Sequence, residues 1–163
     1  MHTLIPLAQK VADALVARGE TIGVSESSAG GLISAALLAI PGASAYYRGG
    51  GVIYAGAAFK GLMQLTKDDV QGMRSSTEPY AALMARTIRD RLRADWGLCE
   101  TGAAGPGGNP YGDPSGHTCL AMAGADGHVV TKTLETGLDD RAANMERFAE
   151  AALTHALSIL SAP

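Results

Sequence analysis

The spacing of apolar residues predicts helices and strands in turn along the first third of the chain. Residues 3–18 repeat apolar positions at helical intervals and stop at Gly19, as an amphipathic helix does. A short run at residues 21–24 predicts a buried strand. Residues 32–40 predict a second helix, apolar on most sides and therefore expected against the sheet centre. Residues 49–54 predict a second strand, whose consecutive glycines suit a bulge or a close backbone approach.

The rest of the chain continues this alternation and ends in a hairpin and a long helix. The clearest helix begins at residues 76–79, where a capping residue, an acid and a proline stand in order. Residues 124–127 separate two alternating runs and predict a hairpin. The other predicted elements are a short helix at 57–64, a capped turn at 66–69, a strand at 96–101, hairpin strands at 117–123 and 128–134, and a final helix from 139–140 to about 160. This alternation indicates an α/β protein.

Length and charge narrow the class of protein. The chain has 163 residues, which is typical of one domain, so residues 1–163 are expected to form a single domain. Its 13 basic and 16 acidic residues give a net charge of −3. Such a balance offers no electrostatic footprint for a nucleic acid or an anionic membrane, so a small molecule is the expected partner. With 21 glycines and 5% aromatic residues, backbone-lined turns are expected rather than large aromatic surfaces.

The cysteines and the amino-terminal residues indicate a reduced, cytoplasmic protein. Cys99 and Cys119 each fall in a predicted buried strand, and the four histidines never approach metal-ligand spacing with them, so no metal is expected. Residues 1–10 lack the charged and apolar regions of a signal peptide. The longest nearly apolar run, residues 32–40, is far too short to span a bilayer.

The most informative segment is the run at residues 25–31, Ser-Glu-Ser-Ser-Ala-Gly-Gly, between a predicted strand and a predicted helix. The first N–H groups of a helix lack internal partners, and the helix dipole adds positive charge there, so an anion or a developing oxyanion is stabilised. A second interpretation needs no chemistry: Ser27 or Ser28 is only the N-cap, and the glycines only permit a tight turn.

Three glycine-rich segments each follow a predicted strand: residues 27–31, 54–56 and 101–108. Crevices in open α/β sheets form beyond the carboxyl ends of strands, so these segments are expected to converge on one pocket. The third segment opens a loop at residues 102–116 with six glycines and three prolines, and long irregular loops in compact domains are usually functional or disordered. The common phosphate-binding fingerprints and the nucleophile elbow of hydrolases are absent from the sequence.

These segments carry a family resemblance over nearly the whole chain. The sequence resembles the CinA C-terminal domain family, also called nicotinamide mononucleotide (NMN) deamidases. Its blocks read approximately T-A-E-S-C-T-G-G, R-G-x-V-x-Y-x-x-x-x-K, T-G-I-A-G-P-x-G-G and P-V-G. They correspond here to residues 24–31, 48–54 with one extra glycine, 101–108 and 114–116. The resemblance implies a compact, single-domain, three-layer-like α/β fold with a mixed sheet flanked by helices.

The resemblance also implies an activity, namely hydrolysis of the carboxamide of NMN to the acid and ammonia without a metal or cofactor. By position, Ser27 would be the nucleophile, Lys60 and Tyr54 would complete the catalytic group, and Tyr54 would line the base or amide pocket. The residues implied to bind substrate are Glu26, Ser28, Gly30, Gly31, Thr101, Gly102, Ala104 and Gly105. Arg141 or Arg147, near the start of the last helix, would contact the phosphate, unless it is simply an exposed helix-start arginine.

Departures from the family pattern leave two functions open. Five residues after its tyrosine the family has a lysine, where this chain has Phe59, and the nearest amine is Lys60. Because one helical step turns a side chain by about 100°, Lys60 replaces that lysine only if the register shifts. Asp113, Glu26 or His117 are alternative acid-base groups.

The resemblance favours an amidohydrolase acting on NMN or a related carboxamide, whereas Phe59 favours a non-catalytic protein that binds a nucleotide or other small ligand. In the segment after Ser27, Ser28-Ala29 also replaces the cysteine-threonine pair of the family. Apolar helices rich in alanine and glycine, together with the resemblance, suggest a homo-oligomer.

Overall fold

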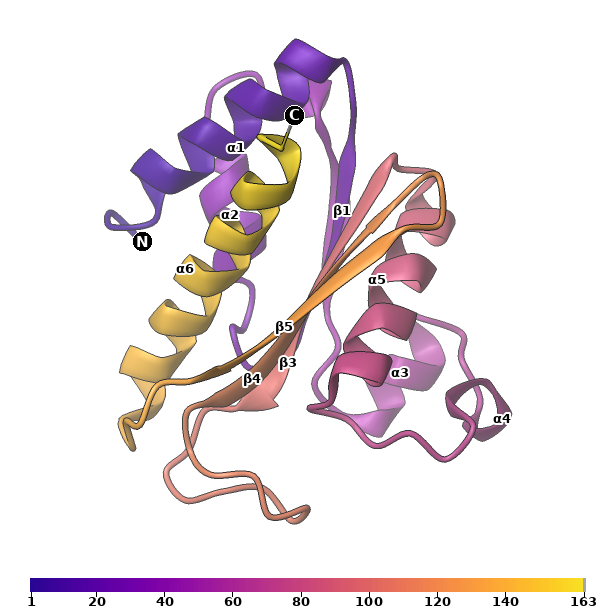
Figure 1. The fold of residues 1–163 in the computed structure, drawn as a ribbon, viewed down its shortest axis with the longest axis vertical. Coiled ribbons are helices and arrows are strands. Elements are labelled where there is room, and N and C mark those ends of the chain that lie inside the picture. The colour runs from indigo at the N-terminus through magenta and orange to yellow at the C-terminus, as the bar shows by residue number, and fades with distance from the viewer. Residues whose placement is uncertain (163) are drawn as a thin grey trace.

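A five-stranded mixed sheet forms the centre of the molecule, with strand order β2-β1-β3-β4-β5. The computed structural model describes residues 1–162 (Figure 1). The strands are β1 (Ile22–Glu26), β2 (Tyr47–Val52), β3 (Trp96–Ala103), β4 (His117–Gly124) and β5 (Val129–Glu135). β1 is parallel to both β2 and β3, whereas β3–β4 and β4–β5 are antiparallel. The mixed sheet and the carboxy-terminal hairpin predicted from the sequence are therefore confirmed.

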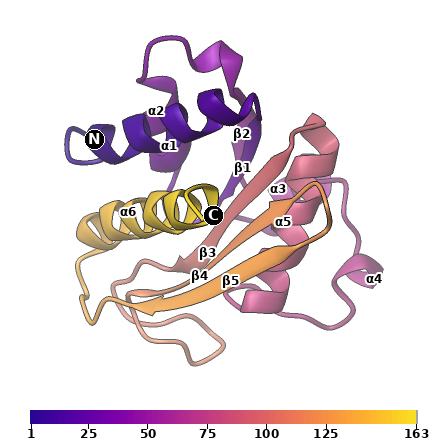
Figure 2. The same ribbon diagram turned by 45° about the horizontal axis from the view of Figure 1, so that its top comes forward.

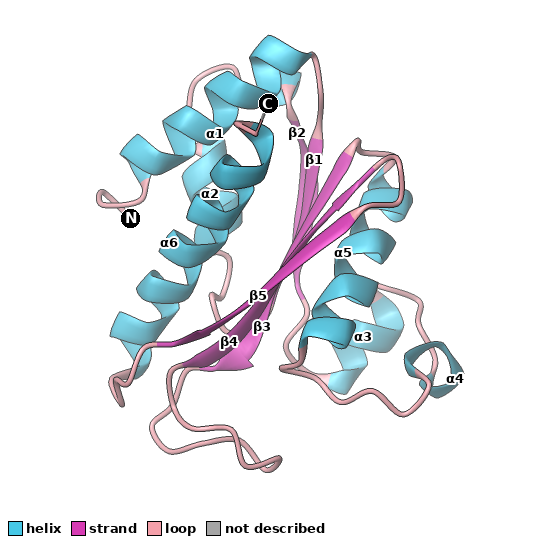
Figure 3. Ribbon diagram, viewed as in Figure 1, coloured by secondary structure: helices cyan, strands magenta, loops and turns pink. Residues whose placement is uncertain are grey.

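Helices cover both faces of this sheet and complete the three layers (Figures 2 and 3). One face carries α1 (Ile5–Arg18), α2 (Leu32–Leu38) and α6 (Arg141–Leu160), and the other carries α5 (Glu78–Leu92) with the short α3 (Gly56–Gly61) and α4 (Lys67–Val70). A 3₁₀ turn, η1 (Ala43–Ala45), leads into β2. A larger apolar core lies under α1, α2 and α6, and a smaller one lies under α5.

Local sequence signals explain where the long helices begin and end. Gly19 ends α1 in the left-handed conformation with φ of 65°. The side chain of Thr77 accepts the N–H of Tyr80 at the start of α5, and that of Asp140 accepts the N–H of Ala143 at the start of α6. These caps confirm the helix starts that the sequence predicts.

The glycine-rich strand β2 runs very close to its neighbours. A Cβ atom at Gly50 would lie 2.7 Å from Ser34 Oγ and 2.9 Å from the carbonyl oxygen of Val24, closer than real side chains approach. The pairing register between β1 and β2 also shifts between Ile22 and Gly23, as a bulge does. Both the bulge and the close approach are thus present, although β2 begins and ends two residues earlier than the sequence predicts.

Candidate active site

The carboxyl ends of β1 and β3 open on a cavity of about 500 Å³. Ser27 follows β1 directly, while Thr101 and Gly102 lie just before the last residue of β3, and all three line the cavity. The segment after β2 contributes Tyr54. Because parallel strands present the same end at one edge of the sheet, the three glycine-rich segments converge there, as expected from the sequence.

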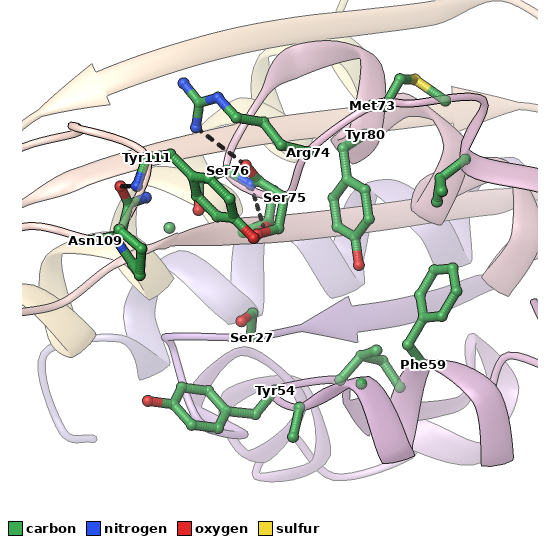
Figure 4. Close-up of a pocket in the computed structure, with 17 residues that line it drawn as sticks. Ser27, Tyr54, Phe59, Met73, Arg74, Ser75, Ser76, Tyr80, Asn109 and Tyr111 are labelled. Carbon is green, nitrogen blue, oxygen red and sulfur yellow. Dashed lines mark hydrogen bonds between the residues drawn. The ribbon is translucent and has the colours of Figure 1, made fainter. Parts of the chain in front are cut away.

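Aromatic side chains are concentrated in this cavity. The chain has eight aromatic residues, and four of them line the cavity: Tyr54, Phe59, Tyr80 and Tyr111. The rings of Phe59 and Tyr80 stack with their centroids 6.3 Å apart and their planes at 22°. Figure 4 shows Ser27 between this pair and the side of the cavity that Tyr54 and Tyr111 form. The walls suit a flat, aromatic ligand. The low aromatic content of the sequence did not predict this concentration of aromatic side chains.

A second hollow of about 230 Å³ adjoins the first and shares Tyr54, Gly102, Asn109 and Pro110 with it. Backbone of residues 102–108 forms most of its wall. Arg141, at the start of α6, closes it: one guanidinium nitrogen donates to the carbonyl of Gly105 at 2.5 Å, and another donates to the Tyr54 hydroxyl at 3.2 Å. A fixed cation beside glycine-rich backbone suits an anionic group such as a phosphate.

Two buried carboxylates hold the turn that carries Ser27. Glu26 is 1% exposed and accepts the N–H groups of Gly31, Ile33 and Ser34 at 3.1, 2.9 and 2.8 Å. The N-cap position of α2 is Gly31, which has no side-chain cap. The sequence-based picture of free amides at this helix start is therefore wrong, and so is the alternative of a serine cap, because Glu26 takes the helix amides itself.

Glu100, the second of these carboxylates, was missed by the sequence analysis. It lies on β3, is 1% exposed, and its Oε2 accepts the N–H of Ser27 at 3.0 Å and of Ala29 at 2.8 Å. Burial raises the pKa of Glu100 to about 7; the three hydrogen bonds to Ala29, Ser27 and Thr118 oppose the rise and the nearby Glu26 adds to it. A charged residue inside the otherwise uncharged strand at residues 96–101 was the available signal.

The backbone N–H of Ser28 stays without an acceptor among residues 1–162, while its hydroxyl donates to the carbonyl of Gly102 at 2.6 Å. The amide that follows a nucleophilic serine is a common oxyanion donor in hydrolases. Of the amides at residues 27–29, only that of Ser28 is free to bind a substrate atom, because Glu100 already accepts the N–H groups of Ser27 and Ala29.

An ion pair anchors the long loop at the rim of the cavity. Arg74 donates to both carboxylate oxygens of Asp113, at 2.6 and 3.0 Å, and its guanidinium lies 5.2 Å from the centre of the Tyr111 ring. The Arg74 hydrogen bond lowers the pKa of Asp113 to about 2. Asn109 adds a hydrogen bond to Asp113 at 2.7 Å. Arg74 and Asn109, which line the cavity, were also missed. Nothing near Arg74 in the sequence marks it, whereas Asn109 lies in the glycine-rich loop at residues 102–116.

The structure brings together most, but not all, of the site residues expected from the sequence. Ser27, Tyr54, Thr101 and Gly102 line the larger hollow, and Ser28, Ala104, Gly105 and Arg141 line the smaller one together with Tyr54 and Gly102. The residues outside both linings are Glu26, Gly30, Gly31 and Lys60. Arg147 instead borders a groove between β5 and α6.

Phe59, rather than Lys60, belongs to the cavity wall. Phe59 is half-buried and lines the cavity, whereas Lys60 is exposed on α3. The bulge in β2 therefore does not move the lysine into the site, and the turn of about 100° per helical residue directs Lys60 elsewhere. Of the alternative acid-base groups, Glu26 holds the start of α2, Asp113 pairs with Arg74, and His117 contacts the carbonyl of Ser76 at 2.9 Å.

Three further findings concern the described part of the chain. Within residues 1–162, no three His, Cys, Asp or Glu side chains gather closely enough to hold a metal ion. No helix in the same range has the length and apolar character needed to cross a membrane. Cys99 and Cys119 are buried and free.

Fold and site together define an α/β domain with a cleft at the carboxyl ends of its parallel strands. The chain belongs to the CinA C-terminal domain family, whose sequence model matches residues 4–160. This confirms the family that the four sequence blocks indicate.

Relatives and solved structures agree with this assignment. CinA-like proteins of Gloeobacter violaceus and Chlorobium limicola are 42% and 34% identical over 72% and 94% of the chain, which spans only 28% and 37% of their lengths. A CinA superfamily protein from Klebsiella pneumoniae has a TM-score of 0.89 at 26% identity, over 97% of this chain and 98% of that one. The competence/damage inducible protein CihA from Agrobacterium tumefaciens has a TM-score of 0.88 at 28% identity, over 98% and 96%.

Proposed function

We propose that this protein binds NMN or a related pyridine carboxamide ribonucleotide and hydrolyses its carboxamide to the acid and ammonia. The observation that carries the proposal is the position of Ser27 on the wall of an aromatic-lined cavity that continues into a hollow ending at Arg141. The aromatic walls match a pyridine ring, and the guanidinium with its glycine-rich surroundings matches the phosphate. A ligand with a flat ring at one end and an anion at the other fits both hollows at once.

The reaction would run through an acyl-enzyme on Ser27. Its Oγ attacks the carboxamide carbon, and the oxygen that gains negative charge lies against the free N–H of Ser28. When the C–N bond breaks, the amide nitrogen takes up the hydroxyl proton and leaves as ammonia. Water then attacks the ester carbon, and cleavage of the ester returns the serine hydroxyl and releases the acid.

Within the described part of the chain, the site lacks a strong base that could accept the proton of the Ser27 hydroxyl. No Lys, His, Asp or Glu lines either hollow, and Phe59 lies where the family resemblance implies a lysine. The hydroxyl proton would pass through water or neighbouring hydroxyls, which are poorer bases. A positioned base typically contributes about 10²–10⁴-fold, so turnover well below that of a lysine-containing relative is expected.

Phe59 also supports a second candidate function, a binding protein without catalysis. The Phe59–Tyr80 stack completes an aromatic wall and so strengthens the case for ligand binding while it removes the base. In this case the protein would hold the nucleotide unchanged.

Ammonia release from NMN by the purified protein separates the two candidates. Ser27→Ala is expected to abolish release, and Ser44→Ala, an exposed serine on η1, is the matched control that should leave it unchanged. Thermal shifts with NMN and nicotinate mononucleotide report binding independently. Stabilisation without ammonia release supports the binding protein, and release that survives Ser27→Ala contradicts the nucleophile.

A further inference from the structure

Glu100 contacts the Ser27 turn from a strand that lies 73 residues further along the chain. Its carboxyl group is almost fully buried on the face of the sheet that α2 covers. It accepts the N–H of Ser27 and the N–H of Ala29 on a single oxygen, Oε2, at 3.0 and 2.8 Å. The two amides flank Ser28, whose own N–H is free, so one carboxyl oxygen fixes the backbone on both sides of that amide.

We propose that Glu100 is a positioning residue, whose carboxyl group fixes the backbone of residues 27–29 and thereby holds the Ser27 hydroxyl at the cavity and the Ser28 amide at the adjoining hollow. This inference rests on the proposed function, in which those two groups act on the substrate. Glu100 lines neither hollow and would not touch the ligand. Its effect passes through the turn alone.

The second oxygen of Glu100 takes part in an arrangement that can hold or release a proton. Thr118 Oγ1 lies 2.9 Å from Glu100 Oε1 and 3.2 Å from the carbonyl oxygen of Thr101. When Glu100 is ionised, the threonine hydroxyl donates to Oε1. When Glu100 is protonated at Oε1, it can donate to Thr118, whose proton then turns to the carbonyl of Thr101. Both states keep every polar group paired, and Oε2 accepts the two amides in each.

The two states differ in how firmly they hold the turn. Hydrogen bonds to an ionised carboxylate are about twice as strong as those to a neutral acceptor. Ionisation of Glu100 therefore tightens the bonds to Ser27 and Ala29, and protonation loosens them. The proposal accordingly includes a dependence of Ser27 chemistry on the charge of a buried group that lies outside the cavity.

Few other ionisable groups lie near Glu100. Burial raises the pKa of the adjacent Cys99 thiol well above its ordinary value, so this group stays protonated around neutral pH. Glu26, at the end of β1, is the carboxylate that acts on it, and β4 contributes the hydroxyl of Thr118. α2 has no ionisable side chain. α6, which packs on the same face, buries the uncharged Asn144 near its start, and its buried His155 contacts β5. A titration that disappears when Glu100 is replaced would therefore belong to Glu100 or to its pair with Glu26.

Two substitutions at this position separate charge from shape. Glu100→Gln keeps an oxygen for the amides and an NH₂ group that donates to Thr118, but it cannot ionise. Glu100→Ala removes the acceptor. Asp95→Asn is the matched control, because Asp95 accepts the N–H and the hydroxyl of Thr21, both at 2.8 Å, at the opposite end of β1.

The decisive measurements are amide exchange by NMR and steady-state kinetics with NMN. In Glu100→Ala, exchange at Ser27 and Ala29 should accelerate by about tenfold or more, while Asp95→Asn leaves it unchanged. Displacement of a reacting group typically costs up to about 100-fold, so kcat should fall by about 10- to 100-fold with little change in KM. Glu100→Gln should lose less activity and should lose any dependence of kcat on pH around neutrality.

The exchange measurement separates a failure of this proposal from a failure of the proposed function. If the wild type does not turn over NMN, the proposed hydrolysis fails, while exchange at Ser27 and Ala29 still tests whether Glu100 holds the turn. Unchanged exchange in Glu100→Ala, or in Glu100→Gln if the alanine variant does not fold, would overturn the proposal. Equal losses of kcat in Glu100→Ala and Asp95→Asn would reduce Glu100 to a general structural role and would also overturn it.

Discussion

Replacement of Phe59 by lysine would test whether the site lacks only a base. Phe59 is half-buried on the cavity wall that also holds Ser27, and its ring stacks on Tyr80. A lysine at this position would begin from the same backbone atoms and could extend its amine into the cavity. Partial burial lowers the pKa of a lysine, which favours the neutral amine that a base requires.

The expected decrease in activation free energy is larger than the expected decrease in the free energy of unfolding. A positioned base contributes about 10²–10⁴-fold, which corresponds to about 3–5 kcal/mol of activation free energy. The substitution removes an aromatic pair that contributes about 0.5–1.5 kcal/mol. With the partial burial of an amine added, the free energy of unfolding should fall by about 1–3 kcal/mol. Phe59→Lys is therefore expected to fold and to release ammonia from NMN about 100-fold faster than the wild type.

Ammonia release under saturating NMN is the assay, with three comparison proteins. Phe59→Met removes the ring without adding an amine and should give no gain. Lys60→Ala should leave the wild-type rate unchanged, because Lys60 is exposed and outside the cavity. Combining Phe59→Lys with Ser27→Ala should abolish the gain. The reasoning is refuted if Phe59→Lys binds NMN without faster release, or if Lys60→Ala silences the wild type.

Two further predictions concern the loop anchor and the buried carboxyl. Loss of the Arg74–Asp113 pair should free the rim loop, so Arg74→Ala and Asp113→Ala should each raise the KM for NMN, and the double variant should raise it no further; additive increases in steady-state kinetics would contradict a shared anchor. Burial holds the pKa of Glu100 at about 7 in the folded protein, above its ordinary value of 4.5. The folded state therefore binds this proton more tightly, and the stability it adds at low pH is lost as the pH rises from about 4.5 through about 7. Urea unfolding of wild type and Glu100→Gln should diverge across that range, and parallel curves would count against the assignment.

Local signals in the sequence were sufficient to predict the order of the elements and the part of the chain where a site would form. Apolar spacing, capping residues and glycines are local signals, so they predicted the helices, the hairpin and the place of residues 25–31 at the junction of β1 and α2. Pockets lie beyond the carboxyl ends of parallel strands, so the sequence also predicted that Ser27, Tyr54 and Thr101 line one cavity, as they do. Local patterning suffices for such features because each depends on residues a few positions apart.

The groups that surround Ser27 depend on contacts between distant segments of the chain. Glu26 and Glu100 accept hydrogen bonds from backbone amides that were expected to be free. Glu100 does so from a strand 73 residues away from Ser27. The sequence also left open whether Phe59 or Lys60 enters the cavity. Adjacent helical residues differ by about 100° in direction, so a shift of one residue in register decides which side chain does. Long-range hydrogen bonds and helix rotation depend on how distant segments pack, and no local pattern in the sequence records them.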